Sequence, residues 1–218
     1  MIVRLLRRLA HREGGYTVVE LSLSMVLSSM IFASLVTVIY SFTQQAGDTT
    51  RSANLQQTSR ELVADMVVEL RQAVKVEPNG YPIESLTSGA LVFYSDRLES
   101  EGPERIVYER RDCANGICEL WVSRYPAVAG TGPWWTFSTV AMQSGMVLHR
   151  LPDDQPLFEG INWVGEPPAR TVMSTCGGVG PECDFPLVRI TFRSKPINTS
   201  PGADFTLEVQ EEVRLRNG

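Results

Sequence analysis

An uncharged apolar stretch is the strongest pattern in the chain. Residues 21–43 read LSLSMVLSSMIFASLVTVIYSFT and contain no charged side chain. As an α-helix rising about 1.5 Å per residue, this stretch is long enough to cross a hydrocarbon core of roughly 30 Å. A helix is expected because a bilayer offers no partner for free backbone N–H and C=O groups. We therefore predict a membrane-spanning helix over residues 16–44.

The pattern becomes amphipathic after this stretch. Apolar residues recur at helical spacing over residues 55–74, and Pro78-Asn79-Gly80 is a strong helix-ending signal. We therefore assign residues 45–77 to a continuation of the helix and expect its last helical residue near Val76. Three acidic residues follow one another at steps of four: Glu61, Asp65 and Glu69. We expect this acidic row to lie on a solvated helix face.

Strand patterns and turn residues dominate the remaining part, residues 78–218. Six runs have the composition of strands, and the last of them also shows partial alternation of apolar and polar residues: 90–95, 105–111, 119–125, 145–151, 187–193 and 205–216. Four segments rich in Gly and Pro are predicted to be loops: 129–133, 166–169, 176–186 and 195–203. The predicted fold class is α+β, with a long N-terminal helix followed by a mostly antiparallel sheet.

Four cysteines lie in this part of the chain, in two closely spaced pairs. Asn115-Gly116 is a two-residue hairpin signal, and a turn there makes Cys113 face Cys118 at a separation that a disulfide accepts. A second disulfide, Cys176–Cys183, would close a Gly- and Pro-rich loop. Both pairings fit an oxidising compartment. Two alternatives remain: a metal site, which the spacing disfavours, and free thiols.

Charge is unevenly distributed along the chain, whose formal net charge is -5. Residues 1–15 hold four arginines and one glutamate, a net charge of +3, which leaves about -8 for residues 16–218. Basic residues before the apolar stretch keep the first residues cytoplasmic and place the chain after residue 44 outside the cytoplasm. The acidic body argues against broad attraction to nucleic acid, although a local site stays open.

The boundary between the basic segment and the apolar stretch reads EGGYTVVEL, residues 13–21. It resembles the class III signal of type IV prepilins, in which a short basic leader ends in Gly before an aromatic residue, with Glu at the fifth place of the mature chain. The resemblance implies that a prepilin peptidase cleaves after Gly15, that Tyr16 becomes N-methylated, and that the apolar helix is retained. An ordinary cleaved signal peptide and a plain single-pass anchor are the alternatives.

Glu20 also has a physical argument of its own. An ionisable group at the edge of a membrane span is costly, and it is usually paired or functional. Cleavage would create an ammonium group at Tyr16, and in the prepilin family this glutamate is thought to pair with that group on a neighbouring subunit. The simpler alternative is that Glu20 lies at the membrane interface and reaches water.

Two further features of the sequence leave alternatives open. The small residues of the apolar stretch let helices approach closely, or are merely tolerated there: Ser22, Ser24, Ser28, Ser29, Ala33 and Ser34. Trp134-Trp135 is either an exposed contact patch or, as we favour, a pair of partly buried core or loop aromatics. No common catalytic motif appears, so we predict no enzyme activity, no cofactor and no metal.

Residues 59–73 and the ending 213–217 resemble, more loosely, the matching segments of PilW-type and GspJ-type minor subunits. Together with the leader, this resemblance implies a minor pilin or pseudopilin that primes or caps a type IV pilus or a type II secretion pseudopilus. Its partners would be prepilin peptidase, other pilins or pseudopilins, and the cytoplasmic membrane, which it crosses once. A filament-associated module for adhesion or DNA uptake and a membrane-anchored envelope enzyme are the rival hypotheses.

Overall fold

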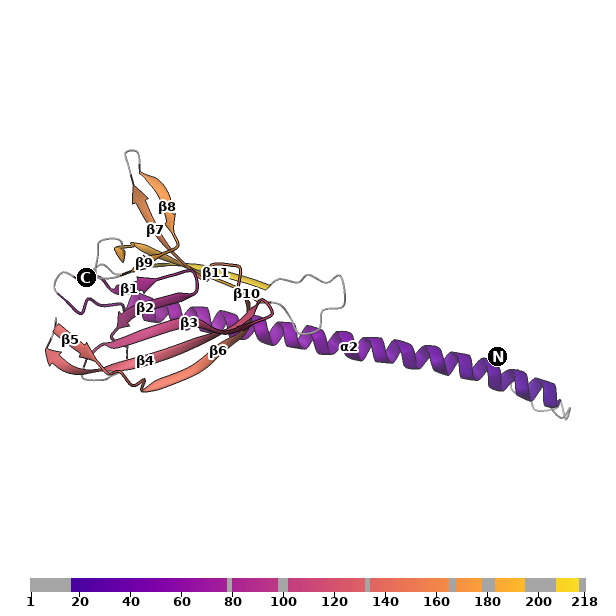
Figure 1. The fold of residues 1–218 in the computed structure, drawn as a ribbon. Coiled ribbons are helices and arrows are strands. Elements are labelled where there is room, and N and C mark those ends of the chain that lie inside the picture. The colour runs from indigo at the N-terminus through magenta and orange to yellow at the C-terminus, as the bar shows by residue number, and fades with distance from the viewer. Residues whose placement is uncertain are drawn as a thin grey trace, which may run out of the picture. The chain divides into compact units, whose positions relative to one another are not determined.

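A computed structural model describes residues 17–77, 80–97, 102–131, 134–164, 168–177, 183–194 and 207–215. The chain divides after Thr49 into two compact units, and each is described by itself. The fold class is α+β, as predicted, with a long N-terminal helix and antiparallel strands (Figure 1). The predicted leader, residues 1–15, and Tyr16 lie outside the described residues.

The helix α2 (Val18–Arg71) contains 54 residues and continues without interruption through Gly47. It ends at Arg71, so the prediction of a helix to about Val76 was wrong. The backbone that follows is taken up by strand β2 (Ala90–Ser95) instead. Ala73 forms a bridge with Ser95, and the Val74 N–H donates to the Tyr94 carbonyl at 3.0 Å. These sheet-type bonds end the helix before the proline and glycine are reached.

Seven strands form the first sheet, all of them paired antiparallel in the order β5-β4-β3-β2-β1-β9, with β6 also beside β4. Besides β2, they are β1 (Ile83–Leu86), β3 (Glu104–Ala114), β4 (Ile117–Thr131), β5 (Trp134–Phe137), β6 (Gln143–Pro152) and β9 (Cys176–Gly177). Since β4 has 15 residues, β6 pairs with its first half and β5 with its end.

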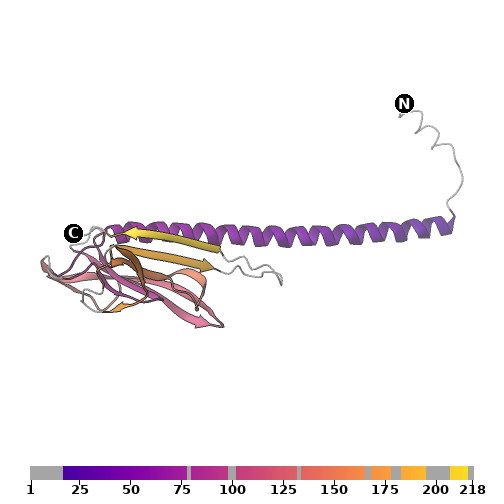
Figure 2. The same ribbon diagram turned by 90° about the horizontal axis from the view of Figure 1, so that it is seen from above.

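The second sheet has four strands in the order β11-β10-β7-β8, again antiparallel. They are β7 (Phe158–Val164), β8 (Ala169–Met173), β10 (Leu187–Ser194) and β11 (Leu207–Arg214). Figure 2 shows β10 and β11 side by side, along the part of α2 that belongs to the same unit. The β7–β8 hairpin projects from the rest of the sheets (Figure 1).

The core of this unit lies between the C-terminal part of α2 and the two sheets. One stripe of α2 is buried in it, at Val63, Met66, Val67 and Leu70. Residues from both sheets complete the same cluster, among them Phe93, Tyr108, Leu120, Phe158, Val188 and Phe192. The apolar face predicted by the amphipathic pattern after residue 45 is therefore the face of α2 that packs against the sheets.

All six predicted strands are confirmed within the described residues. The run 90–95 coincides with β2, the next four lie inside β3, β4, β6 and β10, and the last contains β11. Three loop predictions were wrong in part, because β4 extends to Thr131, β8 begins at Ala169 and Cys176–Gly177 forms β9. The strands that were not predicted are β1, β5, β7, β8 and β9.

Candidate functional site

The first turn of α2 is closed by a reciprocal pair of hydrogen bonds. The backbone N–H and the hydroxyl of Thr17 donate to Oε2 of Glu20, at 3.1 and 3.2 Å. The Glu20 N–H donates in return to the Thr17 hydroxyl at 3.2 Å. This is a capping box, in which Thr17 precedes the helix and an acidic side chain three residues later bonds back to it. Sequence reasoning missed this role of Glu20, although the T-x-x-E spacing carries the signal.

The helix that follows Glu20 is apolar and open on all sides. Every side chain over residues 18–47 is exposed, including the large ones at Phe32, Tyr40 and Phe42. By length and composition, α2 is the one helix in the described part of the chain that could cross a membrane. A surface of this kind requires cover, which lipid or neighbouring helices can supply.

Hydroxyl groups along this apolar segment bond within the helix itself. They donate to the backbone carbonyl three or four residues earlier, at 2.8 or 2.9 Å, from Ser22, Ser24, Ser29, Ser34, Thr37, Ser41 and Thr43. Each such bond satisfies a polar hydrogen without a partner from outside. The exposed surface of the segment is therefore less polar than its serine content indicates.

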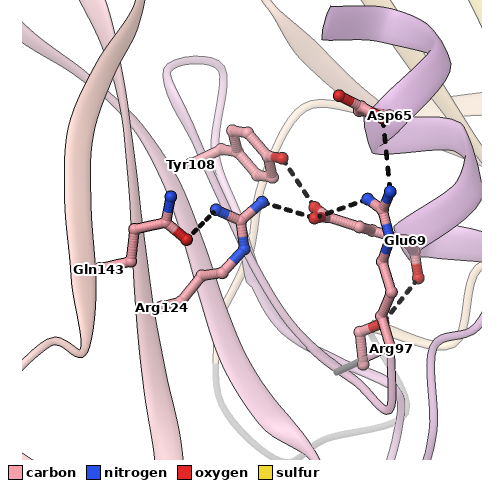
Figure 3. Close-up of polar contacts among 7 residues, drawn as sticks. Asp65, Glu69, Arg97, Tyr108, Arg124 and Gln143 are labelled. Atoms are coloured by element: carbon pink, nitrogen blue, oxygen red, sulfur yellow. Dashed lines mark hydrogen bonds and ion pairs between the residues drawn. The ribbon is translucent and has the colours of Figure 1, made fainter. Parts of the chain in front are cut away.

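A buried carboxylate holds the other part of α2 to the first sheet. Glu69 is only 1% exposed, and its side chain receives three hydrogen bonds (Figure 3). The Tyr108 hydroxyl donates to Oε2 at 2.7 Å, and the Arg124 and Arg97 guanidinium groups donate to Oε1 at 2.5 and 3.2 Å. The backbone carbonyl of Glu69 also accepts the Ser95 hydroxyl at 3.1 Å. One residue of α2 thus contacts strands β2, β3 and β4 together with the segment after β2.

Charges in this cluster balance. Arg97 also reaches Asp65 at 3.5 Å, so two arginines face two carboxylates. The Asp65 side chain remains 65% exposed, whereas Glu69 is buried. The prediction that the acidic row lies on a solvated helix face was therefore wrong for Glu69. A paired, hydrogen-bonded charge of this kind is tolerated in a protein interior, and an unpaired one is not.

The pKa values of Tyr108 and Arg124 in the Glu69 cluster indicate a structural role for the cluster rather than a catalytic one. Burial, and then the nearby Glu69 charge, raise the pKa of Tyr108 well above its usual value. Burial lowers the pKa of Arg124, but the hydrogen bond and charge of Glu69 outweigh it and raise that pKa overall. Neither group can change charge near neutral pH, and the carboxylate already accepts three donors. The cluster therefore stabilises the packing of α2 against the first sheet.

A second, smaller cluster lies on strands β1, β2 and β3. Arg105 donates twice to the Glu84 carboxylate, at 2.6 and 2.7 Å, and the Tyr94 hydroxyl donates to it at 2.7 Å. Partial burial raises the pKa of Glu84, but the hydrogen bonds from Arg105 and Tyr94 and the Arg105 charge outweigh it, so the pKa falls below its ordinary value of 4.5. The cluster ties the short strand β1 to its neighbours.

This lowered pKa predicts how stability depends on pH. A carboxyl group whose pKa is lower in the folded state contributes stability above its unfolded pKa and loses it as pH falls through the folded value. Between about pH 4.5 and 3, we expect the free energy of unfolding of the wild type to fall more steeply than that of Glu84→Gln. Denaturant titrations at several pH values measure the two slopes, with the exposed Glu61→Gln as control. Equal slopes for wild type and Glu84→Gln would contradict the assignment.

Both predicted cysteine pairs are disulfide-bonded in the structure, Cys113–Cys118 and Cys176–Cys183. Cys113 and Cys118 flank the Asn115-Gly116 turn, whose positive φ angles of 54° and 74° are those of a two-residue hairpin turn. The Cys176–Cys183 bridge joins β9 to the chain that leads into β10, and both of its residues are buried. In the described ranges, no group of three or more His, Cys, Asp or Glu side chains is placed so that it could hold a metal ion.

The structure therefore brings the predicted site residues together only in part. The four predicted cysteines form two disulfides, Cys113–Cys118 and Cys176–Cys183, and Glu20 caps α2. Gly15 and Tyr16 lie outside the described residues.

Comparisons with protein-family models, with curated proteins and with solved structures found no match.

Proposed function

We propose that this protein is a structural subunit of a pilin-like filament, inserted in the cytoplasmic membrane and assembled through the first part of α2. The observation that carries the proposal is the isolated charge of Glu20. It stands at the start of an apolar helix that has no other charged residue before Asp48 and whose side chains are all exposed over residues 18–47. A single carboxylate in this position calls for a cationic partner.

Cleavage after Gly15 would supply that partner, the new ammonium group of Tyr16. The two bonds of the capping box both use Oε2 of Glu20, and its Oε1 makes no hydrogen bond to any described residue. A carboxylate accepts bonds at both oxygens, so Glu20 can cap its own helix and bind the amine of a neighbouring subunit at the same time. This double role would fix the axial register between adjacent helices, because the charges meet in one relative position.

The resemblance of the leader boundary narrows the proposal to a minor pilin or pseudopilin that primes or caps its filament. In this proposal, prepilin peptidase processes the chain, and Tyr16 is methylated. Residues 1–15 face the cytoplasm, and the part after residue 44 lies outside it. The disulfides fit that placement, since thiols oxidise in such compartments. The enclosed charge network of Glu69 favours a structural rather than a catalytic role for this part of the chain.

Mass spectrometry of the mature N-terminus tests the proposal most directly. We expect the chain purified from its native membrane to begin at Tyr16 and to carry one methyl group. Replacing Gly15 with a bulkier residue should leave the leader attached and abolish incorporation into filaments. A wild-type chain that retains Met1, or one that is cut after Thr43, would exclude the proposed processing and with it the filament assignment.

A further inference from the structure

A polar groove lies on the face of β10 that is turned away from the core. Side chains alternate along a strand, so the residues between the buried Val188, Ile190 and Phe192 point to the opposite face. The groove has a volume of about 290 Å³, close to the lower end of small-molecule sites. Its polar lining comes from β10, from both neighbouring strands and from the segment before β7, and includes Gln155, Glu159, Arg189, Thr191, Arg193 and Gln210.

Two arginines of this groove are held in place by carboxylates. Arg189 donates to Glu159 at 2.9 Å and to Glu212 at 3.1 Å. Arg193 donates to Glu208 at 3.1 Å. A guanidinium group has more N–H donors than these bonds use, so each arginine keeps donors for a ligand. Because both side chains are already fixed, little conformational entropy would be lost on binding.

Between the two arginines, the groove presents polar groups that have no partner. Within the described residues, neither the Thr191 hydroxyl nor the side-chain amide of Gln210 takes part in a hydrogen bond, and the two residues face each other across β10 and β11. A hydroxyl and an amide can each donate and accept. The groove therefore offers donors and acceptors together, at fixed positions on a sheet.

The charges that line the groove disfavour a simple ion. Arg189 and Arg193 are balanced by the carboxylates of Glu159 and Glu208. An anion that approached either arginine would also meet the carboxylate bound to it, and a cation would meet the guanidinium group. The groove is therefore suited to a neutral ligand with several hydrogen-bonding groups.

The position of the groove on the sheet favours a sugar over a peptide. An extended peptide is commonly recognised through backbone hydrogen bonds at a sheet edge. Strand β10 is paired on both sides, with β7 and with β11, so its backbone is already bonded and only side chains face the groove. Adjacent hydroxyls of a sugar ring donate and accept, as the Thr191 and Gln210 side chains do.

None of the residues that line the groove is aromatic, so a sugar would be held there by hydrogen bonds. Trp134, an exposed aromatic residue, lies on β5 in the other sheet. It is 63% exposed, so our preference for partly buried tryptophans at positions 134 and 135 was wrong for Trp134. Hydrogen bonds to a ligand replace bonds to water and are individually weak. We therefore expect a dissociation constant closer to about 1 mM than to about 1 μM.

We infer that the groove over β10 is a binding site for a neutral sugar unit of a glycan. Thr191 and Gln210 bond to its hydroxyls at the centre of the groove, and Arg189 and Arg193 donate to it from the two ends. This binding is separate from filament assembly, because no residue of α2 lines the groove. In the proposed placement of the chain, the glycan lies outside the cytoplasm.

Saturation-transfer NMR tests the inference on the full-length chain in a detergent without a sugar headgroup. The probes are neutral methyl glycosides of glucose, galactose, mannose and N-acetylglucosamine, measured beside glucuronate, inorganic phosphate and a capped alanine tripeptide. We expect at least one neutral glycoside to bind at about 10 mM and the other three probes to give no signal. Absence of binding by every neutral glycoside would overturn the inference. Preferential binding of glucuronate, phosphate or the peptide would overturn it too.

Removal of the Thr191 hydroxyl locates the bound glycoside. Thr191→Val keeps the side-chain volume, so it should lower the affinity about tenfold and leave the unfolding midpoint unchanged. Thr171→Val makes the same change on β8, outside the groove, and should leave the affinity unchanged. Gln210→Met, on the exposed face of β11, is an independent variant and should weaken binding about fivefold. Wild-type affinity in both Thr191→Val and Gln210→Met would place the sugar elsewhere and exclude the groove.

Discussion

Replacing Glu69 with glutamine is expected to lower the free energy of unfolding by about 3–5 kcal/mol. The substitution removes one charge but almost no volume, so the loss reports the charge network rather than a cavity. It leaves the Arg124 guanidinium, only 16% exposed, without its carboxylate and the buried Tyr108 hydroxyl without its charged acceptor. Denaturant unfolding of the full chain in detergent, followed by the fluorescence of its four tryptophans, measures the change.

Asp65→Asn is the matched control for this prediction. Asp65 lies one turn earlier on the same helix and contacts the same Arg97, but its side chain is 65% exposed. We expect it to cost less than about 1 kcal/mol, as solvent-exposed ion pairs usually do. If both variants lose a similar, small amount, Glu69 does not hold the helix to the sheet in the way that its contacts indicate.

Glu20→Gln is expected to reduce incorporation into filaments by about tenfold or more, while insertion in the membrane stays normal. Glutamine can still accept the Thr17 N–H through its side-chain oxygen, so the cap of α2 is retained. What disappears is the charge that we propose to pair with the Tyr16 amine of the next subunit. A tenfold loss corresponds to about 1.4 kcal/mol, well within what separation of a poorly solvated ion pair costs.

Thr17→Val separates the two roles of Glu20, because it removes the capping hydroxyl and keeps the charge. We expect near-normal incorporation from this variant, once mass spectrometry has established that its leader is removed as in the wild type. Quantitative immunoblots of sheared filaments and of membranes measure both variants. Should Thr17→Val fail as severely as Glu20→Gln, the helix cap rather than the charge would be what assembly requires.

Helix geometry explains why the sequence did not predict the Glu69 cluster. Residues four apart on an α-helix are offset by about 40°, so Glu69 is rotated by about 80° from Glu61. This rotation carries the acidic row from the solvated face into the buried stripe, where Glu69 lies three residues after Met66 and four before Ala73. The spacing of Glu69 from the buried apolar residues indicates that it is buried, whereas its spacing from the other acidic residues does not. Its partners Arg97 and Arg124 are distant in sequence and could not be assigned.

The sequence predicted those strands and turns whose formation depends on residues close together in the chain. The short apolar run 90–95 predicted β2, and Asn115-Gly116 predicted the hairpin turn, because both signals depend on neighbouring residues alone. Strands β1 and β9 have four and two residues, too few to establish a period, and they form because another strand is available to pair with them. The early end of α2 has the same origin, since strand β2 competes for the backbone of Ala73 and Val74.

The hydrogen bonds from serine and threonine hydroxyls to backbone carbonyls of α2 affect how easily the apolar segment could move from lipid to a protein surface. A serine hydroxyl without a partner in its own helix would favour surroundings that offer a hydrogen-bond acceptor, and it would disfavour lipid. Since Ser22, Ser24, Ser29 and Ser34 bond to carbonyls of their own helix, acyl chains and the flank of a sibling helix are nearly equivalent to them. In the proposed assembly, transfer of this helix from acyl chains to the surface of neighbouring helices would therefore break few polar bonds.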